Sequence, residues 1–205
     1  MMAFRLHIIY WLLSGFMLGG IGRLAAQEHR AVTAIADTAA IHALQRQAYI
    51  HPNPDSSMAW FGRALKASLT AGYKAGVARA YMGMGLRQLE RGNYLAGFTS
   101  FNQALPYSLR SHDTETISSN YINRGLALFY LGDYVQSAAS YHMAEKMAAT
   151  LRPPLPRLNI KIFTNLGITC FRMGQFRWSQ HYMMQALQLA RQQNMPALLA
   201  QTLLN

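Results

Sequence analysis

The sequence predicts an all-α fold in which antiparallel helix pairs stack on one another as an α-solenoid. A short turn centred on glycine occurs three times, at Gly92, Gly132 and Gly174, and this period of about 40 residues is typical of helical repeats. Apolar residues on both sides of each turn recur at the three- and four-residue spacing of a helix. A hydrophobic content of 51% in 205 residues supplies a continuous core. Because one helix pair cannot bury its apolar face alone, such units must stack.

Each predicted unit carries the same residue types at fixed distances from its turn. A glycine stands seven positions before the turn glycine, an alanine stands twelve after it, and an aromatic residue or Met precedes that alanine by three. These residues are Gly85, Gly125 and Gly167, then Ala104, Ala144 and Ala186, then Phe101, Tyr141 and Met183. A glycine inside a helix costs about 1 kcal/mol relative to alanine. We therefore expect the paired helices to pack backbone to backbone at these glycines, with the aromatic residue filling the groove against the next pair.

The pattern places four complete units along the chain. They cover residues 38–72, 78–112, 118–156 and 160–194. The register extends back to Phe61 and Ala64, which stand one full period before Phe101 and Ala104. Gly72 is expected to end a helix, Asp113 to cap the start of one, and the proline-rich stretch 153–156 to separate two units.

A partial fifth unit is expected to begin at Pro196. Asn205 has the same phase in it as Asn123 and Asn165 have in theirs, about halfway along a first helix. A solenoid needs a polar terminal cap, and residues 197–204 are mostly apolar. The repeat region 38–205 is therefore expected to be truncated from a longer protein; a short native cap and pairing with a second copy are the alternatives.

Residues 1–26 are predicted to be a secretory signal peptide. Arg5 precedes an apolar run over residues 8–22, and small residues surround a cleavage point after Ala26. An uncleaved signal anchor is the alternative, although the stretch between Arg5 and Arg23 falls short of the about 20 residues that cross a bilayer. Residues 27–37 would form a linker. The repeat region is thus expected to be exported, periplasmic or extracellular, or membrane-anchored if the signal is kept.

The chain is strongly basic, with 19 Lys and Arg against 8 Asp and Glu and a formal net charge of +11. Such a surface favours acidic proteins, anionic lipids or anionic polymers, and a solvated basic face without a charged ligand is the alternative. Nucleic acid is not expected as a partner, because an exported chain rarely meets it and no segment concentrates Lys and Arg.

The third unit combines an aromatic residue, a glycine, a Gly-Asp-Tyr turn and an alanine-rich second helix. The matching residues are Tyr121, Gly125, Gly132, Asp133, Tyr134, Tyr141 and Ala144. They resemble the tetratricopeptide repeat (TPR) family over residues 34–205, which implies a right-handed superhelix. The period is longer than the usual one of about 34 residues, and is similar to the long repeats of kinesin light chains. HEAT and armadillo repeats are the alternative family, but they do not require a Gly-x-aromatic turn.

The resemblance also implies a concave face lined by the first helix of each pair. The positions carried over are Arg79, Met82, Glu90, Ser119, Asn123, Leu126, Tyr130, Lys161, Thr164, Asn165 and Arg172. Asparagine both donates and accepts hydrogen bonds, so Asn123 and Asn165 would bind successive peptide amides, similar to the asparagine ladders of kinesin light chain and O-GlcNAc transferase repeats. The basic residues would attract carboxylates. The alternative is that both asparagines bond to neighbouring helices, and Gly83 interrupts their row in the second unit.

No catalytic pattern is present in the sequence, which has no His-Glu-x-x-His, no Gly-x-Ser-x-Gly, no phosphate-binding glycine loop and a single Cys. His112, Asp113 and Glu115 cluster at a turn, where helix capping is expected, and Cys170 has a core phase. We therefore predict a non-enzymatic scaffold, without cofactor or metal, that binds a protein or peptide in its groove. The alternative is the extracytoplasmic sensing region of a longer signalling protein, such as a sensor histidine kinase.

Overall fold

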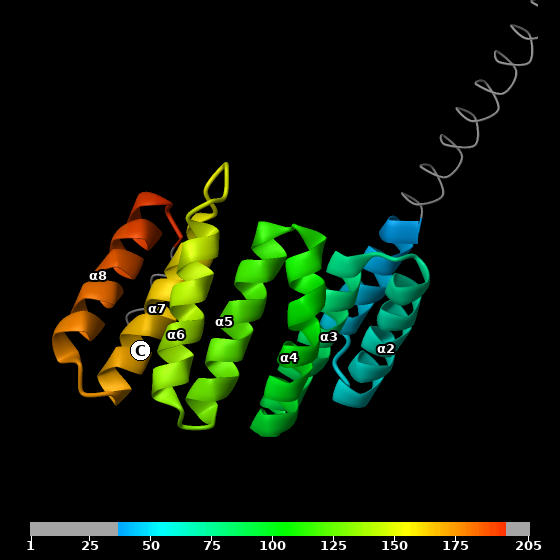
Figure 1. The fold of residues 1–205 in the computed structure, drawn as a ribbon, viewed down its shortest axis with the longest axis horizontal. Helices are drawn as coiled ribbons and strands as arrows, with labels where there is room; N and C mark the ends of the chain where they lie inside the picture. The colour runs from blue at the N-terminus through cyan, green and yellow to red at the C-terminus, as the bar shows by residue number, and fades with distance from the viewer. Residues whose placement is uncertain (1–36, 196–205) are drawn as a thin grey trace, which may run out of the picture. The chain divides into compact units, whose positions relative to one another are not determined.

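The computed structural model describes residues 37–195, and all regular structure in that range is α-helical. Residues 37–50 are helical, and seven further helices follow in chain order (Figure 1). They are α2 (Pro54–Thr70), α3 (Lys74–Glu90), α4 (Tyr94–Ser111), α5 (Thr114–Tyr130), α6 (Tyr134–Ala148), α7 (Pro156–Arg172) and α8 (Phe176–Gln192). The predicted all-α fold is confirmed. The signal segment and the partial fifth unit lie outside the described residues.

The helices form antiparallel pairs that stack in sequence order. Contacts divide the chain into residues 1–40 and 41–205, and the pairs belong to the second unit. Within it α3 packs on α4, α5 on α6, and α7 on α8, while α2, α4 and α6 each contact the first helix of the next pair. First helices also touch one another, α3 with α5 and α5 with α7. This arrangement is the predicted right-handed α-solenoid (Figure 1).

The glycine turns inside the pairs have the conformation that explains their recurrence. Gly92, Gly132 and Gly174 have φ of +77°, +82° and +73°, the left-handed region that residues with a Cβ adopt at a cost. After each of them the chain bonds back to the preceding helix, as where the Asp133 N–H donates to the Leu128 carbonyl at 3.0 Å. These bonds satisfy carbonyls that a helix end would leave free. Gly72, at +64°, ends α2 in the same way.

Over the helix glycines, a large side chain of the second helix fills the space that a Cβ would need. A Cβ on Gly85 would lie 2.4 Å from the Phe101 ring, and a Cβ on Gly125 would lie 2.7 Å from the Tyr141 ring. Each glycine therefore makes room for the large side chain of the second helix. Whether the side chain of the second helix points toward the glycine decides what fills the space over it.

The expected close backbone approach also occurs at these glycines, against the start of the second helix. A Cβ on Gly97 would lie 3.0 Å from the Gly85 carbonyl oxygen. In the next pair Ser137 Oγ donates a 2.8 Å hydrogen bond to the Gly125 carbonyl oxygen. A small residue at this position therefore lets the two helices cross closely.

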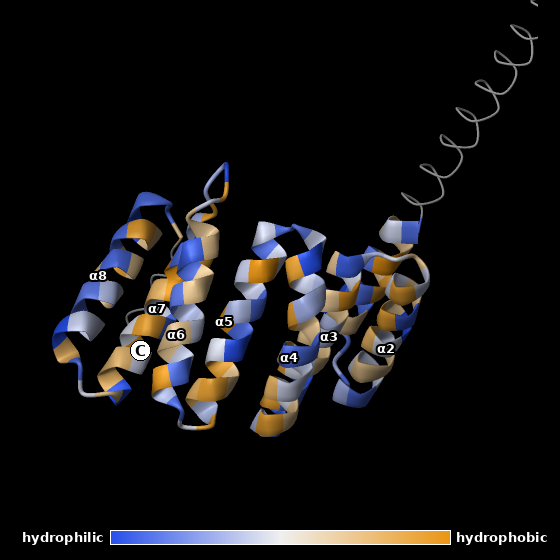
Figure 2. Ribbon diagram, viewed as in Figure 1, coloured by the Kyte–Doolittle hydropathy of each residue, from blue (hydrophilic) through white to orange (hydrophobic). Residues whose placement is uncertain are grey.

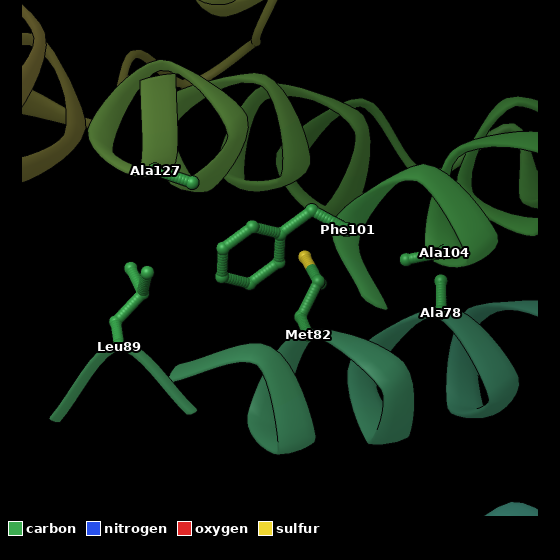
Figure 3. Close-up of a cluster of buried hydrophobic side chains, with 6 residues drawn as sticks. All are labelled: Ala78, Met82, Leu89, Phe101, Ala104 and Ala127. Carbon is green, nitrogen blue, oxygen red and sulfur yellow. The ribbon is translucent and has the colours of Figure 1, made fainter. Parts of the chain in front are cut away.

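The core runs from one pair into the next. One cluster of buried side chains joins α3, α4 and the following α5 (Figure 3). It consists of Ala78, Met82, Leu89, Phe101, Ala104 and Ala127. Phe101 is fully buried, between the Gly85 backbone of its own pair and Ala127 of the next. The same large side chain therefore stabilises both the pair and the stack, as expected for the aromatic residue of each unit.

The connections between pairs follow the predicted signals. Asp113 caps α5, its side chain accepting a hydrogen bond from the Thr116 N–H. Between α6 and α7 the chain makes the longest connection between described helices, residues 149–155, and Pro156 is the first residue of α7. This connection projects from the end of the helices (Figure 1). It accommodates the slightly greater spacing between the last two glycine turns.

None of the described helices is both long enough and apolar enough to cross a membrane.

Candidate functional site

The first helices of all four pairs line one groove of about 330 Å³. Its polar or charged lining consists of Tyr49, Arg79, Glu115, Thr116, Ser119, Asn123 and Lys161. Its apolar lining consists of Met82, Leu86, Ile122 and Leu158. Tyr49 belongs to the helix over residues 37–50 and the rest to α3, α5 and α7. Since none of the described second helices contributes, the groove lies on the face that the TPR resemblance implies.

The structure brings together part of the predicted site. Arg79, Met82, Ser119, Asn123 and Lys161 all line the groove. Arg79, Ser119 and Lys161 occupy the same position in successive units, so they form a row across α3, α5 and α7. This row places cationic groups beside hydroxyl and amide groups and an apolar floor. The combination suits a peptide segment with a carboxylate and an apolar side chain.

Arg79 is tied into a network that joins three first helices. Its guanidinium donates to Asp113 Oδ2 at 2.6 Å, to Thr116 Oγ1 at 3.2 Å and to the Tyr73 hydroxyl at 3.1 Å. His42 Nε2 lies 3.3 Å from Arg79 Nη1 and 3.0 Å from the same hydroxyl. We call these residues, His42, Tyr73, Arg79, Asp113 and Thr116, the arginine clamp. It fixes one end of the groove.

The charges of the clamp follow from its contacts. Partial burial acts to raise the pKa of Asp113, but hydrogen bonds from Thr116 and the charge of Arg79 outweigh it, and the net pKa lies below the ordinary value. Desolvation, followed by the charges of Arg79 and Arg46, lowers the pKa of His42. The clamp therefore consists of an ionised Asp113, a cationic Arg79 and a neutral imidazole at neutral pH.

Lys161 is the groove cation that the clamp does not involve. Its side chain is exposed, and no ion pair among residues 37–195 includes it. The surrounding groove walls partly desolvate the ammonium group and lower its pKa. A cation that has lost hydration without gaining a carboxylate is a suitable partner for an incoming anion.

Asn123 has its predicted place in the groove wall, with 6% of its surface exposed. Asn165, at the same position of the next unit, does not line the groove, and Thr164 beside it is buried. Gly83 interrupts the asparagine row because a Cβ there would lie 2.2 Å from the Phe61 ring of α2. The row therefore presents one asparagine to the groove.

The remaining predicted residues lie outside the groove and have other contacts. Glu90 pairs with Arg87 at 2.8 Å. Tyr130 stacks on Tyr94 of the preceding pair, with ring centroids 4.9 Å apart. The Arg172 guanidinium lies 5.8 Å from the ring centroid of Phe129, again in the preceding pair. Leu126 packs on the core cluster of α3 and α4. Tyr130 and Arg172 thus join neighbouring pairs near the turns.

Sequence reasoning missed six residues of the groove lining. They are Tyr49, Leu86, Glu115, Thr116, Ile122 and Leu158. The repeat register could have found two of them, because Ile122 occupies the position of Met82 and Leu86 that of Leu126. No local signal identifies Tyr49 or Leu158. They reach the groove only because successive first helices lie side by side.

The other residues considered for chemistry have structural surroundings. His112 ends α4 with a left-handed φ of 55°. Burial raises the pKa of the Cys170 thiol, which agrees with its predicted core phase. Within residues 37–195 no three His, Cys, Asp or Glu side chains gather as a metal site.

Comparison with known proteins identifies the fold. No protein-family model matches the chain. No curated protein sequence matches it either. Among solved structures, BtubC from P. vanneervenii superposes with a TM-score of 0.64 at 17% identity, over 76% of this chain and 65% of that one. The apo form of RapI superposes with a TM-score of 0.68 at 16% identity, over 75% of this chain and 57% of RapI. The Rap protein complexed with Competence and Sporulation Factor superposes with a TM-score of 0.70 at 13% identity, over 78% of this chain and 45% of the Rap chain.

These neighbours are TPR-like helical repeat proteins. The fold of this chain is therefore TPR-like. At such low identity the likeness extends to the fold alone. The chain spans between about half and two thirds of the length of these three neighbours.

Proposed function

We propose that this protein is an exported, non-enzymatic scaffold that binds an extended protein or peptide segment in its first-helix groove. The observation that carries the proposal is the groove itself, in which successive first helices supply an asparagine, an apolar floor and a lysine that forms no ion pair with any residue of 37–195. One TPR-like neighbour, Rap, has been crystallised with Competence and Sporulation Factor bound. A ligand-binding role for this fold is thus supported. The apolar run over residues 8–22 supports export.

Each part of the groove has a distinct role in the proposed complex. Asn123 would pair with a peptide amide of the ligand, which fixes an extended backbone without selecting side chains. Lys161 would bind a carboxylate, so acidic segments are preferred. Met82, Ile122 and Leu158 would bury an apolar side chain next to that carboxylate. Arg79 would act through the clamp, because its hydrogen bonds already hold it in place.

The test starts from a displayed library of random peptides selected on the full-length protein. Selected peptides are expected to share an acidic residue beside an apolar one. Asn123→Ala and Lys161→Gln should each weaken the measured affinity by about tenfold or more, which corresponds to the loss of one charged or buried hydrogen bond. Lys146→Gln is the matched control, since Lys146 is an exposed lysine on the second helix α6. Equal affinity for all variants would refute the groove as the binding site.

A further inference from the structure

One edge of the solenoid exposes large hydrophobic side chains from all four pairs. We call it the turn edge, because the turns inside the pairs (residues 51–53, 91–93, 131–133 and 173–175) lie along it (Figure 1). Its exposed hydrophobic residues are Ile50, Leu95, Tyr130, Leu131, Val135, Phe171 and Phe176. Val135 and Ile50 are 71% exposed and Leu95 is 67% exposed. Figure 2 shows the hydrophobic colour at the lower ends of α4 and α6 on this edge.

The opposite edge of the described pairs is much less apolar. Its exposed large hydrophobic residues are Leu69 at the end of α2 and Leu109 near the end of α4. Both edges consist of helix ends and connections, so the difference is not a property of helix ends in general. Exposed apolar side chains that gather on one edge of a folded domain indicate an interaction surface.

The apolar side chains of the turn edge are repeated rather than concentrated in one cavity. Leu95 and Val135 occupy the same position in successive units, three positions after the turn glycine. Between the α3–α4 turn and the next turn lies an open, shallow hollow of about 730 Å³, with Leu95 on one side and Leu131 on the other. Protruding side chains at regular intervals along a line suit a flat, laterally extended surface that meets every turn at once.

The acidic groups near the turn edge are already engaged. Asp55 pairs with Arg91 at 2.5 Å, and Glu90 pairs with Arg87. Asp133 caps α6, accepting a 3.0 Å hydrogen bond from the Gln136 N–H. Neither Arg172 nor Arg177, beside the exposed Phe171 and Phe176, is in an ion pair of residues 37–195. Two arginines without an ion-pair partner among the described residues therefore lie beside the exposed rings of the last turn.

The charge increases toward the last described pair. From residue 146 onward the sequence has seven basic residues and no Asp or Glu. The turn between α7 and α8 lies in this region and carries exposed aromatic rings, including Trp178 at 58% exposure. Aromatic and aliphatic side chains together with arginines are the groups that bind at the interface of an anionic bilayer.

We propose that the turn edge docks on an anionic lipid surface. The apolar side chains of the turns enter the headgroup region, and Arg172 and Arg177 bind lipid phosphates. A membrane explains the repetition along the edge better than a protein partner does, because protruding residues need no matching pockets in a fluid interface. This inference is independent of the peptide groove, which lies on first-helix faces.

The test is flotation of the full-length protein with vesicles. Vesicles of phosphatidylcholine with about 30% phosphatidylglycerol, an anionic content that gives a charged surface, are compared with phosphatidylcholine alone. We expect binding to the anionic vesicles and at least tenfold weaker lipid affinity for Val135→Asp combined with Phe176→Asp. The matched control is Leu69→Asp combined with Leu109→Asp on the opposite edge, which should bind as the native chain does. Circular dichroism checks that both variants are folded.

A second measurement reports which edge touches the lipid. Leu95→Trp and Leu109→Trp add one indole at each edge to the same three native Trp residues. Brominated lipid should quench the added fluorescence of Leu95→Trp and leave that of Leu109→Trp unchanged. Equal quenching, or equal flotation of both aspartate variants, would show binding through another segment such as residues 8–22 and overturn the proposal. The proposal would also be overturned if the native protein did not bind vesicles but formed a dimer, and if only the turn-edge aspartate variant abolished that dimer.

Discussion

At the scale of single residues, one helix position can serve either packing or the groove. Gly83 and Asn123 occupy the same position in successive units. In the second unit the Phe61 ring fills the space that a side chain would need. In the third unit Asn123 lines the groove. The ligand-binding row is therefore interrupted in the second unit.

We predict that Gly125→Ala destabilises the protein by about 1–3 kcal/mol, because overpacking against Tyr141 exceeds the helix-propensity gain. The new Cβ would lie 2.7 Å from that ring. Gly62→Ala is the matched control: it is also inside a helix and meets no atom within 4 Å. It should stabilise by about 0.5–1 kcal/mol. Urea unfolding measures the stability change of each variant. Stability changes of the same sign in Gly125→Ala and Gly62→Ala would contradict this account.

Phe101→Ala should cost about 3–5 kcal/mol, the usual range for deleting a fully buried aromatic side chain. The ring is 0% exposed and packs against Gly85 and Ala127, so its loss opens both the pair and the stack. Leu95→Ala, an exposed residue on the same helix, should change stability by less than about 0.5 kcal/mol. The two denaturation midpoints provide the comparison, and a small effect of Phe101→Ala would disprove the shared-core description.

At the scale of elements, the arginine clamp holds the first helices at one mouth of the groove. Its members come from the helix over residues 37–50, from α3 with the residue before it, and from α5 with its N-cap. His42 must stay neutral beside Arg79, since a second cation 3.3 Å away would repel it. Ligand affinity and clamp protonation are therefore expected to be linked.

We predict that acidification from about pH 7 to about pH 5 loosens the clamp. The pKa of His42 is lowered in the folded protein, so the unfolded chain binds more protons below about pH 6.5, and stability falls as the pH falls through that range. His42→Gln should reduce this pH dependence of the urea midpoint. His112→Gln, which alters an exposed histidine, should retain it. An unchanged pH profile in His42→Gln would contradict the prediction.

The elements themselves were predictable because their signals are local. A glycine with positive φ ends a helix wherever it occurs, and apolar spacing fixes which face is buried. The row Arg79, Ser119 and Lys161 followed from the TPR resemblance together with the repeat register. The clamp did not, because the contact of Arg79 with His42 joins side chains on different helices that are distant in sequence. The position of the Tyr141 ring over Gly125 was not predictable either, since the rotamer of Tyr141 depends on its three-dimensional surroundings.

At the scale of the whole molecule, the charge distribution is strongly asymmetric. All eight acidic residues precede residue 146, so the last two described helices, α7 and α8, are purely cationic. Such a chain repels itself when compact, and the few ion pairs of the described residues do not compensate for this. Acidic ligands and anionic surfaces would both relieve the repulsion.

We predict that moderate salt stabilises the folded protein. Raising NaCl from about 20 mM to about 200 mM shortens the Debye length to less than about 10 Å and screens the net charge of +11. The urea midpoint should rise, while peptide binding through Lys161 should weaken. KF at the same ionic strength should raise the urea midpoint by a similar amount if charge screening is the cause. A lower midpoint in salt would mean that ion pairs outweigh net repulsion.

The connection over residues 149–155 offers a practical attachment point. It projects from the helix ends, contributes nothing to the groove lining, and carries the exposed residues Pro153 and Pro154 (Figure 1). Exposed connections tolerate insertions better than packed helices do. A fluorophore or affinity tag placed between these two prolines would therefore let peptide binding and vesicle binding be followed on the same molecule, with both surfaces left free.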